Sequence, residues 1–180
     1  MKIHSIHKSI TSLLLCGFLA ACASSSNQLD MAALEGAEIF NFRAPEEKVL
    51  SSGQPTVSQL GIAARSGVKH VINLRAPGEQ DEFDEAEVVE SLGMEYYSIP
   101  VAGGAGVTPE NAASLQALLE RFEGEPVLVH CASGNRVGGL MALSAFADGA
   151  NADSAIAEGQ RWGLTSENLE AAVRRNISNN

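Results

Sequence analysis

The sequence is poor in basic residues, which number 12 against 22 acidic residues in a chain of 180. Its formal net charge is −10, and no run of lysine or arginine interrupts the acidic balance. An acidic surface of this kind repels nucleic acid and anionic lipid headgroups. This composition therefore excludes nucleic acid as a partner.

Cysteine and histidine are also scarce, with three cysteines and four histidines in the chain. Their spacing matches no metal-binding pattern, and the glycine-rich residues 103–106 lack the spacing of a dinucleotide-binding motif. We therefore predict no metal and no cofactor. The chain shows no internal repeat, and its length suits one domain once a leader is removed.

The longest apolar run lies at the N-terminus, over residues 10–20, and is too short to span a bilayer. Lys2 and Lys8 precede it, and small residues lead from it to Cys22. Leu19-Ala20-Ala21-Cys22 resembles the bacterial lipobox, whose cysteine becomes the acylated first residue of the mature protein. An ordinary signal peptide with an incidental cysteine is the alternative.

The lipobox resemblance implies a domain plan and a location. It implies a signal peptide over residues 1–21, a lipidated and palmitate-bearing tether over 22–36, and a domain over 37–180. Because residue 23 is Ala rather than Asp, the sorting rule of Gram-negative lipoproteins implies the outer membrane, on its periplasmic side. The protein would then contact the membrane through its lipid anchor alone.

Short apolar segments alternate with amphipathic ones along the rest of the chain. Capping patterns at Thr56 and at Thr108-Pro109 open two of the helices, and Trp162 lies in a turn between the last two. This alternation predicts an α/β fold, with one mainly parallel sheet of about four to five strands flanked by helices. The strands are predicted at residues 38–42, 48–51, 68–74, 94–99 and 126–130. The helices are predicted from Thr56 to Gly67, over 79–92, from Thr108 to Gly124, and as two or three more over 136–174.

Cys131 is the one thiol that would remain after loss of the leader and acylation of Cys22, so it has no disulfide partner. It follows a predicted buried strand, and a helix is predicted to begin near Arg136. The turn between them, Ala132-Ser133-Gly134-Asn135, consists of small residues that let backbone N–H groups point inward. A thiol at a helix start beside a guanidinium is expected to be largely thiolate, below an oxyanion pocket. A buried, inert thiol is the alternative.

His130-Cys131, followed by Gly134 and Arg136, resembles the active-site loop of cysteine-dependent protein phosphatases. The resemblance extends over the segments Ser52-Gly53-Gln54-Pro55, Val71-Ile72-Asn73-Leu74-Arg75 and Ile99-Pro100-Val101. As a set, these segments resemble the small bacterial dual-specificity-phosphatase-like branch named after beta-lactamase-hydrolase-like proteins.

The resemblance implies a hydrolase that acts on a phosphorylated protein or small molecule. It makes Cys131 the nucleophile that forms a phosphocysteine, and Arg136 the residue that binds the phosphoryl oxygens. Arg75 is either a second oxyanion contact or a salt-bridge partner of the acidic run 79–87. The remaining substrate-binding residues implied by the resemblance are His130, Ala132, Ser133, Gly134 and Asn135.

Three departures from the phosphatase pattern keep other functions open. Four residues rather than five separate the cysteine from the arginine, Val137 replaces the usual hydroxyl residue, and residues 101–106 lack the general-acid Asp. Glu79, Asp81 and Glu110 are the carboxylates that could reach the site instead. The loop length equally resembles that of rhodaneses, sulfurtransferases that would carry a persulfide on Cys131. A non-catalytic module that binds a phosphate- or sulfate-bearing ligand is the third hypothesis.

Overall fold

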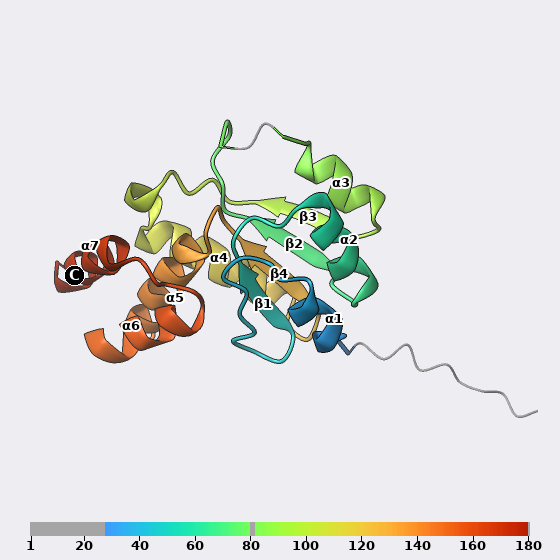
Figure 1. Ribbon diagram of the computed structural model, residues 1–180. Coiled ribbons are helices and arrows are strands. Elements are labelled where there is room, and N and C mark those ends of the chain that lie inside the picture. The colour runs from blue at the N-terminus through green and yellow to red at the C-terminus, as the bar shows by residue number, and fades with distance from the viewer. Residues whose placement is uncertain (1–27, 80–81, 180) are drawn as a thin grey trace, which may run out of the picture.

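The structure is a computed structural model that describes residues 28–79 and 82–179. In these residues four strands form one parallel sheet in the order β1-β4-β2-β3 (Figure 1). Every residue of the two central strands is buried, as expected for a parallel sheet covered on both faces. The predicted α/β fold with a parallel sheet is therefore confirmed. The strands are β1 (Val49–Ser52), β2 (His70–Asn73), β3 (Glu95–Ser98) and β4 (Val127–His130).

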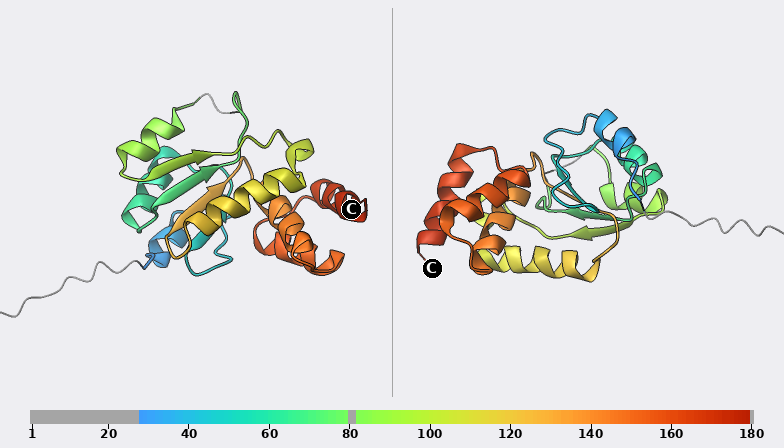
Figure 2. Two further views of the ribbon diagram at one scale, coloured as in Figure 1. Left: turned by 180° about the vertical axis from the view of Figure 1, so that it is seen from behind. Right: turned by 90° about the horizontal axis from the view of Figure 1, so that it is seen from below.

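Helices cover both faces of the sheet, with α1 to α3 on one side and α4 to α7 on the other (Figures 1 and 2). Each face has its own hydrophobic core, because alternate residues of β4 point to opposite sides: Leu128 belongs to the first core, and Val127 and Val129 to the second. The helices are α1 (Met31–Gly36), α2 (Val57–Arg65), α3 (Glu85–Ser91), α4 (Pro109–Arg121), α5 (Asn135–Ala147), α6 (Ala152–Arg161) and α7 (Glu167–Ser178), with a 3₁₀ turn, η1, at Gly104–Gly106.

The two helix starts predicted from capping patterns are confirmed in detail. Thr56 caps α2 with a full capping box, in which its hydroxyl accepts from the Gln59 N–H and the Gln59 side chain accepts from the Thr56 N–H. Thr108 caps α4, and Pro109 occupies the first turn of that helix. Trp162 is fully buried at the end of α6, in the predicted turn.

The strand predicted at residues 38–42 is wrong. Glu38 and Asn41 adopt positive φ angles of 52° and 51°, which break an extended chain, and only a single bridge joins Arg43 to Ser51. Ile39 is buried but Phe40 is 67% exposed, so the apolar pattern of this segment reflects one buried anchor rather than a strand. The helix predicted over 79–92 is also shorter, because Asp84 caps it and it starts at Glu85.

The packed part of the chain begins before residue 37. Residues 28–36, which were assigned to the tether, include α1, and Leu29 and Leu34 are buried in the core on its side of the sheet. The predicted signal peptide and Cys22 lie outside the described residues. Within residues 28–79 and 82–179, no helix combines the length and the apolar character needed to cross a membrane.

Candidate active site

The candidate site lies at the carboxyl end of β4, the edge of a parallel sheet where ligands bind in α/β folds. Cys131 follows β4 directly and is fully buried. Its sulfur accepts a hydrogen bond of 3.1 Å from the Gly134 N–H, and α5 begins one residue later. Within the described chain no side chain caps α5, so the N–H groups of its first turn are available to an anion.

Asn41 supports this loop from behind, although sequence reasoning did not select it. Its Nδ2 donates to the backbone oxygens of Ser133 and Gly163, each at 2.8 Å. Gly134, with φ of 80°, has no room for a side chain here, because a Cβ would lie 2.6 Å from Asn41 Nδ2. Asn tolerates the left-handed conformation that Asn41 adopts, but the sequence pattern gives no sign of its partners.

The loop residues predicted to bind substrate differ in what they offer. The Asn135 side chain joins the loop to the start of α7, because its Oδ1 accepts from the N–H groups of Thr165 and Ser166 at 2.8 and 2.7 Å. Its Nδ2 donates to Ser133 Oγ at 3.2 Å. The side chain of Asn135 therefore has a structural role. Its backbone N–H is the group that could still bind substrate as predicted. Ala132 is exposed and Ser133 half-buried.

Arg136 is buried beside Cys131, with 7% of its surface exposed. Its NH1 donates to Val101 O at 2.6 Å and to Glu79 Oε1 at 2.7 Å, and its NH2 donates to Glu79 Oε2 at 2.6 Å. Burial opposes the charge, but the Glu79 carboxylate and the nearby Cys131 sulfur raise the pKa of Arg136 above its ordinary value. The hydrogen bonds from Arg136 in turn lower the pKa of Glu79.

Of the two candidate carboxylates that the structure describes, Glu79 reaches the site, where it contacts Arg136. Glu110 lies exposed in the first turn of α4. Asp81 lies outside the described residues. The identity of the reaching carboxylate could not be read from the sequence, because all three lie near predicted helix starts, where acids are common.

Arg75 also contacts the Glu79 carboxylate. Its Nε is 3.9 Å from Glu79 Oε2, and its NH1 donates to Gln54 Oε1 at 2.8 Å. The structure thus contains the salt bridge that was one of the two roles considered for Arg75. Its role as a second oxyanion contact stays a prediction.

Glu85 is a site residue that sequence reasoning missed. It is buried at the start of α3, and its Oε1 lies 2.6 Å from Nε2 of the fully buried His130. Its Oε2 accepts from Gln54 Nε2 at 2.9 Å and from Asn73 Nδ2 at 3.1 Å. Burial alone would raise the pKa of Glu85, but its contacts with His130, supported by Gln54 and Arg75, lower it.

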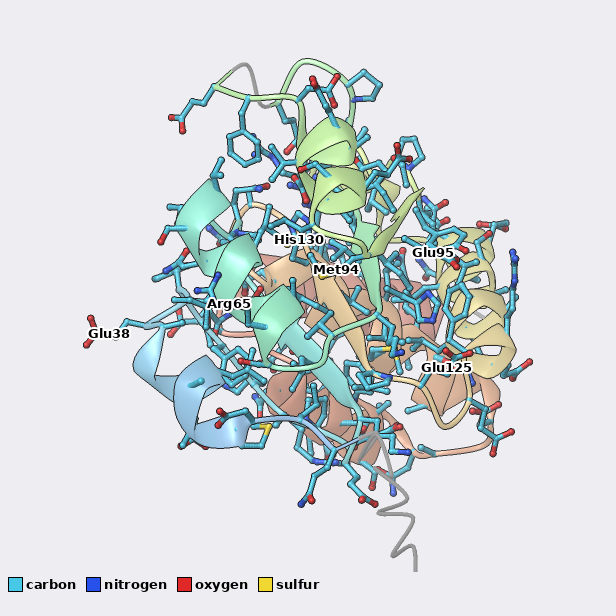
Figure 3. All side chains as sticks on the ribbon, turned by 90° about the vertical axis from the view of Figure 1, so that its right-hand side faces the viewer. Glu38, Arg65, Met94, Glu95, Glu125 and His130 are labelled. Atoms are coloured by element: carbon cyan, nitrogen blue, oxygen red, sulfur yellow. The ribbon has the colours of Figure 1, made fainter. Side chains whose placement is uncertain are left out.

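This buried network joins segments that are far apart in the sequence. Gln54, Asn73 and His130 come from three of the segments that carried the family resemblance, and all three contact Glu85. Figure 3 shows His130 inside the molecule, behind the ribbons of α2 and α3 in that view. The only sequence signal for Glu85 is its place after the helix cap Asp84, where an acid is ordinarily a solvated residue.

The loop opposite the cysteine contains no titratable side chain. Residues 101–106 read Val-Ala-Gly-Gly-Ala-Gly, and Gly103 and Gly104 line a pocket together with Ser133, Asn135 and Arg136. Val137, in place of a hydroxyl residue, is fully buried. Among the described residues no three His, Cys, Asp or Glu side chains are arranged to hold a metal ion.

A parallel sheet whose central strand ends in a buried cysteine, with a glycine turn and a helix-borne arginine after it, is the arrangement expected of the cysteine-phosphatase superfamily. Residues 41–148 match the family described as "Beta-lactamase hydrolase-like protein, phosphatase-like domain", and the chain belongs to this family. The predicted resemblance is therefore confirmed.

Curated relatives and solved structures agree with this assignment. The chain is 36% identical over 107 residues to a beta-lactamase hydrolase-like protein of Xylella fastidiosa and 31% identical to one of Agrobacterium fabrum, a match that covers 57% of this chain but only 24% of each relative. A DUF442 candidate phosphatase of Shewanella putrefaciens shares 25% identity, with a TM-score of 0.59 over 83% of this chain and 97% of that one.

Two further structures share the fold. A candidate phosphatase of Neisseria meningitidis, 22% identical, superposes with a TM-score of 0.64 over 78% of this chain and 98% of its own. Pseudomonas aeruginosa TpbA, solved in complex with phosphotyrosine, is 19% identical and has a TM-score of 0.56 over 86% of this chain and 90% of its own. At these identities the likeness concerns the fold alone.

Proposed function

We propose that this domain hydrolyses phosphomonoesters through a phosphocysteine formed on Cys131. The observation that carries the proposal is the position of the Cys131 sulfur, buried at the start of α5, bonded to the Gly134 N–H and next to the Arg136 guanidinium. Backbone N–H groups and a guanidinium around one sulfur favour a thiolate and a bound oxyanion.

In the first step the Cys131 thiolate forms a bond to phosphorus while the ester P–O bond breaks. The departing oxygen takes its proton from water, since residues 101–106 carry no acid. In the second step a water molecule attacks the phosphocysteine, releasing inorganic phosphate and restoring the thiolate. Without a dedicated acid, the first step depends on the leaving group, so aryl esters of acidic phenols should react and alkyl esters should barely react.

The test is turnover of a series of aryl phosphates by the purified domain, with the rate plotted against the pKa of the leaving phenol. A steep fall that is abolished in Cys131→Ser supports the proposal. Turnover of thiosulfate and cyanide that depends on Cys131, with no aryl phosphate turnover, would overturn it.

Sulfur transfer is the second candidate, favoured by the four-residue spacing between Cys131 and Arg136. The Cys131 thiolate would take the outer sulfur of thiosulfate, release sulfite, and pass the sulfur from the persulfide to cyanide. This reaction needs no acid for a phenolic leaving group. If neither substrate reacts but phosphate or sulfate slows alkylation of Cys131, the non-catalytic binding module is correct.

We also propose that the domain is lipid-anchored in the cell envelope through Cys22, facing the periplasm from the outer membrane. The support is the sequence Leu19-Ala20-Ala21-Cys22 with Ala23 after it. Cys22→Ser should leave the protein without lipid and in the soluble envelope fraction. Wild-type protein that is already soluble and takes up no lipid label would refute the anchor.

A further inference from the structure

We propose that α7 forms one wall of the substrate pocket, and that Asn168 and Leu169 on it select phosphomonoesters whose organic group is small and uncharged. The inference rests on the proposed function, because it names a substrate class for the same site. The family match ends at residue 148, and α7 lies beyond it. The wall is therefore a feature of this chain rather than of the matched segment.

The pocket beside the cysteine loop lies between η1 and α7, which are neighbours in both Figure 1 and Figure 2. A Cβ on Gly104 would lie 3.2 Å from a terminal methyl of Leu169, so the two walls approach each other closely. The residues that α7 and its cap contribute to the lining are Ser166, Asn168, Leu169 and Ala172. The cavity measures about 440 Å³, a volume that suits a small molecule.

Hydrogen bonds with the cysteine loop hold this wall in place. Asn135 Oδ1 accepts from the N–H groups of Thr165 and Ser166, directly before α7. Ser166 Oγ in turn accepts from the Leu169 N–H at 3.4 Å and caps the helix. The start of α7 is thus fixed to the loop that carries the nucleophile, so the pocket needs no rearrangement of this wall to receive a substrate.

The charge of the lining limits what can bind there. Among the described residues that line the pocket, Arg136 is the only charged one, and it is proposed to bind the phosphoryl oxygens. The acidic residues Glu167 and Glu170 lie in the first turn of α7. A second anionic group on a substrate would therefore lose water without gaining a positive partner, so the lining favours an uncharged organic group.

Asn168 and Leu169 offer two different contacts to such a group. The Leu169 side chain is 9% exposed, so it presents a fixed apolar surface at the base of this wall. Asn168 is exposed, and its side-chain amide makes no hydrogen bond within the described part of the chain. Its amide is therefore available to a hydroxyl or carbonyl of the substrate.

The test uses phosphonates, which resemble aryl phosphates but have a P–C bond that the site cannot hydrolyse. Phenylphosphonate and 4-carboxyphenylphosphonate differ by one carboxylate, and their binding is measured as protection of Cys131 from iodoacetamide. In the wild type, we expect the concentration that halves the alkylation rate to be at least about fivefold lower for phenylphosphonate. Asn168→Lys places a cation in the pocket and should reduce this preference to less than about twofold.

Asn179→Lys is the matched control, because it makes the same substitution at the far end of α7. Asn179 is exposed and lies outside the pocket lining. This variant should keep a preference within about twofold of the wild type. A loss of preference in both variants would mean that the added charge acts at long range, and it would overturn the assignment to Asn168.

A second arm tests the apolar contact. Leu169→Ala should raise the half-protecting concentration of phenylphosphonate at least about threefold, because it removes apolar surface from the wall. Protection by inorganic phosphate, which has no organic group, should change by less than about twofold, and Leu169→Met should resemble the wild type. Melting curves show whether Leu169→Ala is folded. If it is not, the exposed position 168 decides the outcome.

Four results would overturn the inference. They are equal protection by the two phosphonates in the wild type, no protection by either, an unchanged preference in Asn168→Lys, and tighter protection by a short peptide bearing a phosphonate analogue of phosphotyrosine. The last result would assign the site to a protein segment. The expected protection pattern without turnover of any aryl phosphate would refute the phosphatase and still support the pocket. Turnover with equal protection by the two phosphonates would refute this inference alone.

Discussion

The two loops that face each other across the candidate site differ sharply in how they are held. The cysteine loop is supported by Asn41 from behind, by the Glu85–His130 pair beneath it, and by Glu79 on its arginine. Residues 101–106 on the other side carry no titratable group and three glycines. Under the proposed function, the difference teaches that oxyanion binding and proton transfer are separable parts of such a site: the described residues support the cysteine loop in detail, whereas residues 101–106 offer no proton donor.

The largest effect is expected from a substitution of Arg136, the residue of the cysteine loop that is proposed to bind the oxyanion. Arg136→Lys keeps the positive charge but loses the planar two-pronged donor. We expect turnover of an aryl phosphate to fall by about 10²- to 10³-fold, the usual loss when an oxyanion contact is removed. Steady-state kinetics with matched melting curves measure this. A loss below about threefold would mean that charge alone, and not orientation, serves the site.

Glu85→Ala should weaken the support beneath the loop. It leaves His130 buried without its partner, which costs about 3 kcal/mol of unfolding free energy. Denaturant unfolding measures this, and Glu87→Ala, at an exposed position on the same helix, is the control.

The same pair predicts a pH dependence of stability. Because the pKa of Glu85 is lower in the folded state than its ordinary value of 4.5, its contribution is complete above about pH 4.5 and is lost as the pH falls through the lower, folded value. The wild type should therefore lose stability below about pH 4.5 more steeply than Glu85→Ala. Parallel pH slopes for the two proteins would show that the pair does not titrate on unfolding.

A smaller effect is expected at Asn41, which ties the loop to the turn after α6. Asn41→Ala removes two hydrogen bonds and places Ala at a positive φ angle, for a cost of about 2 kcal/mol. Asn41→Gly keeps the backbone conformation without strain and isolates the loss of the two donors. Equal melting temperatures for Asn41→Gly and the wild type would show that these hydrogen bonds do not stabilise the loop.

The smallest effect is expected on the opposite loop, residues 101–106, when a carboxyl group is added to it. Gly104→Asp places a carboxyl on the loop opposite Cys131, and its Cβ would lie 3.2 Å from a terminal methyl of Leu169, which can move aside. Turnover of esters with poor leaving groups should rise up to about tenfold, less than a native general acid provides. A slope against leaving-group pKa that stays as steep as in the wild type would mean that the carboxyl does not reach the departing oxygen.

The sequence predicted the parts of the molecule that local patterns encode. The parallel sheet, the caps at Thr56 and Thr108, and the placement of Cys131 at a strand end all follow from short-range signals. Glu85 and Asn41 could not be predicted, because their roles depend on partners that only the folded chain brings near. For Asn41 these partners, Ser133 and Gly163, lie 92 and 122 residues away.

The error at residues 38–42 has the same origin. A short apolar run does not distinguish a strand from a loop with one buried residue. The positive φ angles arise where Glu38 follows the end of α1 and where Asn41 makes long-range hydrogen bonds, and the run encodes neither feature. His70, the first residue of β2, is buried. It stacks on Phe122 with its ring nitrogens 3.6 and 3.3 Å from Glu95 and Glu125, two glutamates that Figure 3 labels along one side of the molecule.

The burial of Leu29 limits how far the domain can move from its proposed anchor. Seven residue steps separate Cys22 from Leu29, and a fully extended chain of that length spans at most about 25 Å. With Cys22 held in the lipid, Leu29 stays within that distance of the bilayer surface, roughly the width of one small domain. The domain would then act only on molecules that are at the membrane or that diffuse up to it. A longer chain between Cys22 and Leu29 would increase the distance from the bilayer at which it can act.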